Sequence, residues 1–279
     1  MLEVAAIASL LSGGLCGLLG YYAQRFNIAT LSFSVAHAAL AGASLALVIK
    51  SDVTYSALVF AILFALGMGI ISTRISPHER ELISMGFFSL FNAIAIFMVY
   101  MSTSYVLSTV SISVVLWGSV LAITKSKLIL LAGITAIFML YLFIFKPQID
   151  SILFDRKLAK AEGVDVDLHT IVLLLFIGIA IAFTLRLTGG FLVFTLLYNP
   201  VASAMQLVRK AQWQQVLAPT IGMLAALLGL TFSYILDWPV GATIAIISST
   251  ILMVAYITRT IINMKLSREA RRAQISRGR

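Results

Sequence analysis

Apolar stretches of roughly twenty residues, separated by short polar ones, run along nearly the whole chain. A helix that crosses a bilayer needs about 20 apolar residues, so each stretch predicts one span. The expected spans lie near 4–23, 28–49, 53–73, 82–101, 127–146, 168–187, 190–206, 215–236 and 239–259. The pattern predicts an all-α polytopic membrane protein with about nine transmembrane segments.

One further apolar stretch, "YVLSTVSISVVLWGSVLAI" at 105–123, is interrupted by serines and a glycine. Lys and Arg concentrate in cytoplasmic loops, which tests whether it crosses. A non-crossing segment puts sixteen of the twenty basic residues on one side, whereas a crossing one puts fourteen there. We therefore expect a re-entrant outer segment, with the N-terminus outside and the C-terminus cytoplasmic.

Composition agrees with this pattern and leaves little chain for a soluble domain. Hydrophobic residues make up 61% of the 279 and charged residues 11%, with a mean hydropathy of +1.03. The net charge of +9 is due largely to a basic tail, which suits contact with anionic membrane lipid. No nucleic-acid-binding module is visible. The expected domains are a transmembrane unit, 1–260, and a basic cytoplasmic tail, 261–279.

Within the spans, His37 is the histidine placed where polarity is costly. An intramembrane ionisable residue marks a pathway or site by default, but an interhelical hydrogen bond explains it equally well. Asn92 and the serines favour the second explanation. His78 and His169 fall in predicted loops and are expected to be solvated. Cys16 is the only cysteine, which excludes an intrachain disulfide.

Prolines predict interruptions in two late spans. Pro200 lacks the N–H that would bond the carbonyl of Leu196, so the helix is expected to kink or break there. Asp237 and Pro239 are expected to begin the last span, as N-cap and first-turn residue. Transporters build midplane sites from such discontinuous helices.

The longest polar insert, "KPQIDSILFDRKLAKAEGVDVDLH" at 146–169, lies on the predicted cytoplasmic side. Asp155 as N-cap and Gly163 as stop predict a short helix. The chain has neither the G-x-x-x-x-G-K-[ST] loop for ATP nor H-E-x-x-H. We therefore expect a transport subunit with no ATPase site, not an enzyme.

Four stretches resemble the permease subunits of ABC importers for manganese, zinc and chelated iron. They are "SFSVAHAALAG" (32–42), "FDRKLAKAEGV" (154–164), "GGFLVFTLLYNPVASA" (189–204) and "SYILDWPVGATI" (233–244). The resemblance implies a type II ABC-importer-like fold in a prokaryotic cell membrane and passage of Zn, Mn or Fe ions. It implies three kinds of partner: a cytosolic ATP-binding subunit that holds ATP and Mg, an external solute-binding protein and a second copy of the chain. Membrane lipid is a further expected partner, from the apolar spans and the basic tail. No cofactor is expected on this chain.

The resemblance also implies site residues. The substrate pathway is expected to include His37, Phe33, Ser34, Asn199, Tyr198 and Asp237, with His37 as a transient metal ligand. A coupling helix at about 150–166 is expected to meet the ATPase through Phe154, Asp155, Leu158, Ala159, Ala161 and Gly163. Small residues at Ala36, Ala39, Ala43 and Ala46 are expected to let α-helices of two copies, or of one subunit, approach closely.

One departure separates this chain from the family pattern. Phe33 stands where the family has an Asp four residues before the His, and Ala41 stands where it has a Pro. A carboxylate is a strong ligand for Mn²⁺ or Zn²⁺, so its absence leaves a second cargo open: a metal chelate or cobalamin-like cofactor on a wider, less charged path. An intramembrane enzyme would need paired catalytic groups, and a scaffold would need neither Pro200 nor His37.

Overall fold

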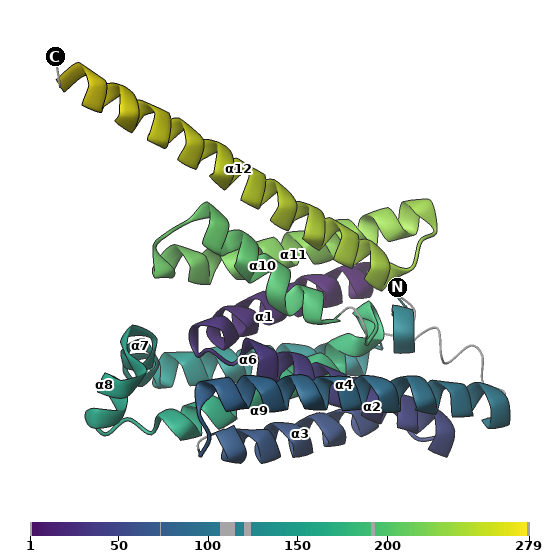
Figure 1. Cartoon of the computed structure of the whole chain (residues 1–279). Coiled ribbons are helices and arrows are strands. Elements are labelled where there is room, and N and C mark those ends of the chain that lie inside the picture. The colour runs from purple at the N-terminus through teal and green to yellow at the C-terminus, as the bar shows by residue number, and fades with distance from the viewer. Residues whose placement is uncertain (1, 73, 107–114, 120–123, 191–192, 278–279) are drawn as a thin grey trace.

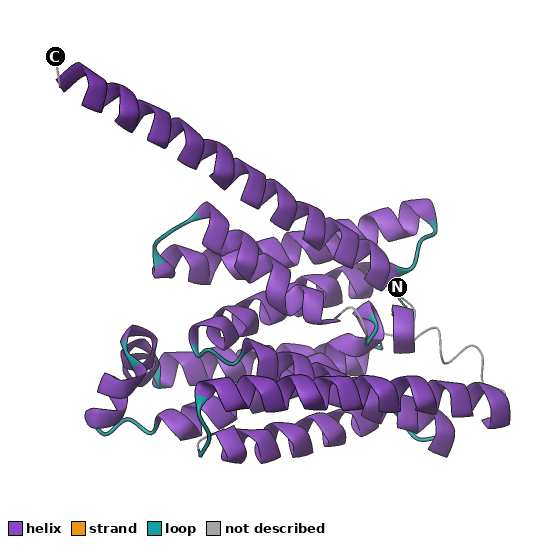
Figure 2. Ribbon diagram, in the orientation of Figure 1, coloured by secondary structure: helices purple, strands orange, loops and turns teal. Residues whose placement is uncertain are grey.

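The computed structural model describes residues 2–72, 74–106, 115–119, 124–190 and 193–277. These residues form helices joined by short turns (Figure 2). The first helices are α1 (Leu2–Arg25), α2 (Ala29–Ile49), α3 (Val53–Ser72), α4 (Pro77–Met101) with a π-helical turn η1 (Ser102–Val106), and α6 (Lys125–Ile144). They are followed by α7 (Lys146–Phe154), α8 (Arg156–Ala161), α9 (Val166–Thr188), α10 (Val193–Leu207), α11 (Ala211–Leu236) and α12 (Val240–Arg277).

The helices run back and forth between two faces of a bundle (Figure 1). One face, which we call the basic face, gathers the turn 26–28, the start of α4, the segment 145–165 and the turn 208–210. Hydrogen bonds join these parts: Arg80 donates to the Asn27 carbonyl at 2.7 Å, and Arg25 donates to Gln214 Oε1 at 2.6 Å. The opposite face carries the turns 50–52 and 237–239.

The segment 102–124 leaves and returns on the opposite face, as the charge bias predicts. Lys127, in the first turn of α6, donates to Thr54 Oγ1 at 2.9 Å and pairs with Asp52 at 3.5 Å. Residues 107–114 and 120–123 lie outside the described residues. The described part reaches inward, since the Gly190 N–H donates to the Val115 carbonyl at 2.8 Å. Gly190 in turn lies directly against Leu40, halfway along α2.

Among the residues that the structure describes, eight helices are long and apolar enough to cross a membrane. Helix α10 returns to the basic face with 15 residues, about 22 Å at 1.5 Å per residue, so the expected ninth span is a short one. It does not break at Pro200, which lies within the helix. The turn that precedes α10 is at Gly189, whose φ is +81°, between the expected spans 168–187 and 190–206. This break is the turn between two helices, and Pro200 adds no second break within α10.

One other expectation, the role of Asp237, differs from the structure. Asp237 does not begin α12 as its N-cap; it ends α11 in a left-handed conformation with φ of 55°. Its location on the opposite face is as expected. Helix α12 passes through residue 260 without interruption and continues to Arg277. The predicted domain boundary is therefore not a break in the helix.

Glycines bring α1 and α11 into backbone contact. A Cβ at Gly13 would lie 2.2 Å from the Gly222 carbonyl oxygen, and one at Gly17 would lie 2.6 Å from the Ala218 carbonyl oxygen. Small residues favour such close approach in membranes because packing, rather than hydrophobicity, drives helix association.

We expect Gly13→Ala to destabilise the protein by about 1–3 kcal/mol, the usual cost of overpacking, because backbone atoms must move apart. Thermal unfolding in detergent measures the shift. Gly133→Ala in α6 is the matched control, since a Cβ there meets no atom within 4 Å. Equal unfolding temperatures for the two variants would show that the α1–α11 contact is loose.

Candidate functional site

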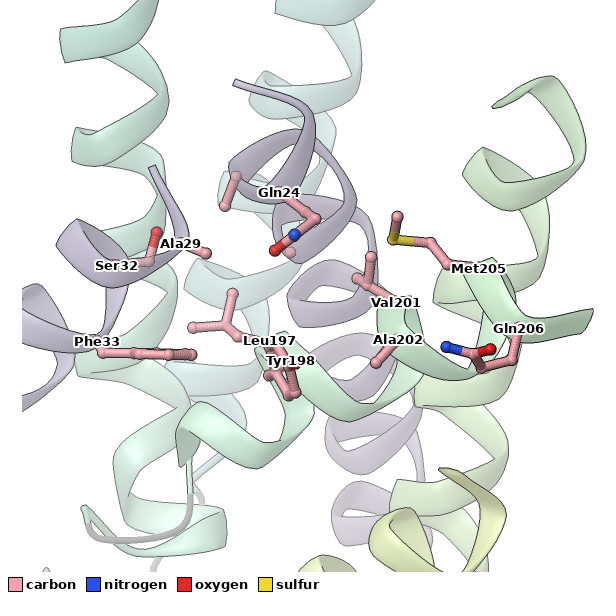
Figure 3. A pocket seen from close by; sticks show the side chains of 12 residues that line it. Gln24, Ala29, Ser32, Phe33, Leu197, Tyr198, Val201, Ala202, Met205 and Gln206 are labelled. Carbon is pink, nitrogen blue, oxygen red and sulfur yellow. The ribbon is translucent and has the colours of Figure 1, made fainter. Parts of the chain in front are cut away.

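A pocket of about 200 Å³ opens between α1, α2 and α10. Figure 3 shows side chains from all three helices directed toward it, with Gln24 and Gln206 among them. The lining residues are Gly20, Ala23, Gln24, Ala29, Ser32, Phe33, Leu197, Tyr198, Val201, Ala202, Met205 and Gln206. Of the residues predicted for the pathway, Phe33 and Tyr198 line it.

The wall of the pocket is largely aromatic and aliphatic. The ring of Phe33 makes edge contacts with those of Phe194 and Tyr198, each at 5.9 Å between centroids. Tyr198 is 44% exposed. This wall offers a cation the face of an aromatic ring, which attracts positive charge weakly, and polar atoms from Gln24 and Gln206. It offers no carboxylate.

His37 lies one helical turn beyond Phe33 on α2 and is 2% exposed. Its ring packs 4.2 Å from that of Phe88 and 6.1 Å from that of Phe194. Nδ1 lies 3.1 Å from the Phe33 carbonyl oxygen; because a carbonyl only accepts, Nδ1 carries the proton. The lone pair of a neutral ring is then on Nε2, the atom free to bind a metal.

The remaining predicted pathway residues are held by other helices. Ser34 Oγ donates to the Ser84 carbonyl at 2.6 Å, which joins α2 to α4. Asn199 Nδ2 donates to Ser249 Oγ at 3.0 Å, which joins α10 to α12. Asp237 lies apart on the opposite face and is exposed. In the described part of the chain, no three His, Cys, Asp or Glu side chains gather closely enough to hold a metal ion.

Burial decides one choice that the sequence left open and shows that one expectation is wrong. The four alanines Ala36, Ala39, Ala43 and Ala46 are at most 1% exposed, so they pack within the subunit and do not face a second copy. His169 is not solvated: it is buried in α9, where its Nδ1 and the Tyr141 hydroxyl form a short hydrogen bond. Hydropathy alone does not separate these environments, since both lipid and protein interior are apolar.

The predicted coupling segment forms α7 and α8. Asp155 caps α8, its Oδ1 accepting from the backbone N–H groups of Lys157 at 2.7 Å and Leu158 at 3.0 Å. These bonds hold the pKa of Asp155 below its usual value. Gly163, with φ of +88°, ends the helix: its own N–H bonds the Lys160 carbonyl and that of Val164 bonds the Ala159 carbonyl. This is the Schellman pattern, in which glycine is preferred.

The same segment presents apolar side chains outward. Phe154 is 84% exposed and Leu158 is 47% exposed, and Ala161 is exposed beside them. Ala159 differs, because it is fully buried in the core and supports α8 from inside. Exposed apolar side chains that lie together and are bordered by charged ones form a surface on which another protein can dock.

The family model of the ABC 3 transport family matches residues 1–259. The chain belongs to the ABC 3 transport family. An uncharacterized membrane protein of Synechocystis sp. is 29% identical over 248 residues, 89% of this chain and 87% of that protein. The manganese transport system membrane protein MntC of Halalkalibacterium halodurans is 28% identical over 255 residues, 91% of this chain and 86% of the relative.

A solved structure shares the fold of this ABC 3 family chain. PsaBC from Streptococcus pneumoniae in complex with Fab matches with a TM-score of 0.75 and 24% identity, covering 91% of this chain and 90% of the other. The family match over residues 1–259, the transport-system relatives and the apolar helices together show that the ABC 3 chain is a multi-pass membrane permease.

The sequence analysis missed several residues around His37 and the pocket of this ABC 3 chain. Phe88 and Phe194 enclose His37, and Gln24 and Gln206 supply polar atoms to the pocket. The phenylalanines carry no signal in an apolar span. The glutamines do, since each is an uncharged polar residue near the predicted inner end of a span and could have been singled out by position.

Proposed function

We propose that this chain is the membrane-spanning permease subunit of an ABC importer that passes a divalent transition-metal ion into the cytoplasm. The observation that carries the proposal is the family match over residues 1–259, joined to a manganese transport relative of nearly full coverage. Manganese is the first candidate, and zinc and iron share the same ligand preferences in part.

The proposed partners supply what an importer needs besides a membrane path: ATP hydrolysis and delivery of the metal. A cytosolic ATP-binding subunit holds ATP and Mg and docks on α7 and α8 through Phe154, Leu158 and Ala161. An external solute-binding protein delivers the metal, and a second copy of the chain closes the path. The basic face is cytoplasmic, because basic residues concentrate on that side, and the opposite face meets the binding protein.

The cargo passes along the pocket wall and meets His37 when the aromatic ring of Phe33 moves aside. Nε2 of the neutral imidazole binds the ion briefly, since imidazole suits several transition metals. Without a carboxylate beside it, the site holds the ion weakly. Weak binding suits a conduit, which has to release its cargo.

A metal chelate is the second candidate, and the aromatic wall of Phe33, Phe194 and Tyr198 favours it. Flat, partly apolar surfaces stack on aromatic rings, whereas a bare dication gains more from carboxylates. The pocket of about 200 Å³ is smaller than most ligand sites, which span about 300–1,000 Å³. A chelate would therefore need the second copy to complete its path.

Uptake in cells decides between these cargoes. Cells that express the permease with its ATPase and binding protein should accumulate radioactive Mn²⁺ well above cells that lack the permease. The proposal fails if accumulation is equal in the two strains for Mn²⁺, Zn²⁺ and Fe²⁺. Uptake that appears only when a chelator accompanies the metal would select the second candidate.

A further inference from the structure

Two arginines from different elements hold the turn between α1 and α2. Arg80, in the first turn of α4, donates through Nη2 to the Asn27 carbonyl at 2.7 Å. Arg156, the first residue of α8, donates through Nη1 to the Phe26 carbonyl at 2.8 Å. Its other nitrogen, Nη2, donates to Thr170 Oγ1 of α9 at 2.8 Å. The turn is thus bonded to the core on one side and to the coupling segment on the other.

The bonds of Arg156 are well suited to transmit a displacement. A guanidinium is planar and presents its N–H groups in a fixed fork, so the two bonds fix its orientation as well as its distance. Burial and the nearby positive charge of Arg80 lower the pKa of Arg156 from its ordinary value. Two cations placed close together repel each other, and the carbonyls of the turn offset that repulsion.

The turn leads directly into the pocket. Ile28 ends it, and no side chain caps α2 there. Within the next five residues α2 contributes Ala29, Ser32 and Phe33 to the pocket wall, while Gln24 lies on the preceding side of the turn. A shift of the turn therefore moves the end of α2 that carries Phe33, the residue whose carbonyl holds His37.

We propose that Arg156 is a positioning residue that transmits movement of the coupling segment to the pocket, through the Phe26 carbonyl and the first turn of α2. This inference rests on the proposed function, since it takes α8 as the element that the ATPase moves. Leu158 and Ala161 face outward from α8, and Arg156 faces inward from the same short helix. A displacement of α8 relative to α4 has to change the Arg156 bonds, because Arg80 ties the turn to α4.

The test uses the full complex of permease, ATPase subunit and binding protein in proteoliposomes, with Mn²⁺ as cargo. Three quantities are measured: copurification of the ATPase subunit, the rate of ATP hydrolysis and the number of ions moved per ATP. In Arg156→Gln we expect copurification and hydrolysis close to wild type, and transport per ATP reduced by about threefold to tenfold, the range in which coupling residues act.

Graded variants separate transmission from a purely structural role. Thr170→Val removes one acceptor and leaves the Phe26 bond, so its loss should be smaller. Arg156→Lys keeps the charge but provides no fork, and should recover transport only in part. Arg74→Gln is the matched control, because Arg74 is an exposed arginine on the same face, and its ratio should stay at the wild-type value.

Three results would overturn the proposal: an unchanged ratio in Arg156→Gln, a parallel fall in hydrolysis and transport, or equal effects of Arg156→Gln and Arg74→Gln. If Arg156→Gln fails to assemble, the ratios of Thr170→Val and Arg156→Lys decide in the same way. Failure of the proposed function itself is distinct, since the wild-type complex would then move no Mn²⁺ at all.

Discussion

Ala161→Glu combined with Gly163→Val is expected to abolish docking of the ATPase subunit and, with it, uptake. Ala161 is exposed on α8 beside Leu158. A carboxylate at this position would lose its hydration on docking, and an apolar contact does not compensate for that loss of solvation free energy. Gly163 has φ of +88°, a conformation that a β-branched residue rarely adopts. The C-terminal turn of α8 should therefore lose its two Schellman hydrogen bonds. Copurification with the ATPase subunit and metal accumulation in cells measure the two losses.

Matched variants show which change matters. Ala161→Ser keeps the size, and Gly163→Asn keeps a residue that tolerates the left-handed region, so this pair should dock and transport nearly as wild type does. Nothing lies within 4 Å of a Cβ at Gly163, so the strain in the valine variant comes from the backbone alone. Normal uptake in the Glu/Val variant would remove the coupling assignment.

His37→Gln is expected to leave a folded permease that still binds its ATPase but imports metal at least about tenfold more slowly. Losing even an outer partner of a metal ligand commonly costs about 10–100-fold in affinity, and this change removes the proposed ligand itself. Glutamine is polar and of similar size, so it can keep the hydrogen bond to the Phe33 carbonyl. Initial uptake rates and thermal unfolding separate the loss of transport from a loss of stability.

His169→Gln is the matched control for that experiment. His169 is also a buried histidine with a hydrogen bond, to Tyr141, but it lies in α9 away from the pocket. We expect it to lower the unfolding temperature without a specific loss of uptake. Normal import by His37→Gln would show that the His37 ring serves only to join α2 to its neighbours.

The sequence was informative wherever charge or backbone chemistry left a mark. Basic residues indicated that the segment 102–124 returns to its own face, and Asp155 and Gly163 marked both ends of a helix. It was uninformative inside the bilayer. An alanine has the same hydropathy whether it faces a helix of its own subunit or one of a second copy, so the sequence left both surfaces open for Ala36 and Ala43. Phe88 and Phe194 were invisible for the same reason, although they enclose His37.

The sequence predicted a kink or break at Pro200, but the helix continues through it. Pro200 fits within α10, as prolines in membrane helices do when neighbouring groups satisfy the freed backbone. The break at Gly189 lies between the expected spans 168–187 and 190–206, but its close backbone contact with residues 115 and 116 is one that no local pattern reveals.

That break also limits how the protein can be recombined with its relatives. The Gly190 N–H bonds the Val115 carbonyl, and a Cβ at Gly189 would lie 2.3 Å from the Leu116 carbonyl oxygen. Stretches 75 residues apart thus touch through main-chain atoms at membrane depth, where an unmatched N–H has no water to bond. A chimera that takes 102–124 from one permease and 189–193 from another would combine two segments that were not matched for this main-chain contact. Exchanged segments should therefore be inherited as a pair, and surveys of natural variation should find insertions in one accompanied by changes in the other.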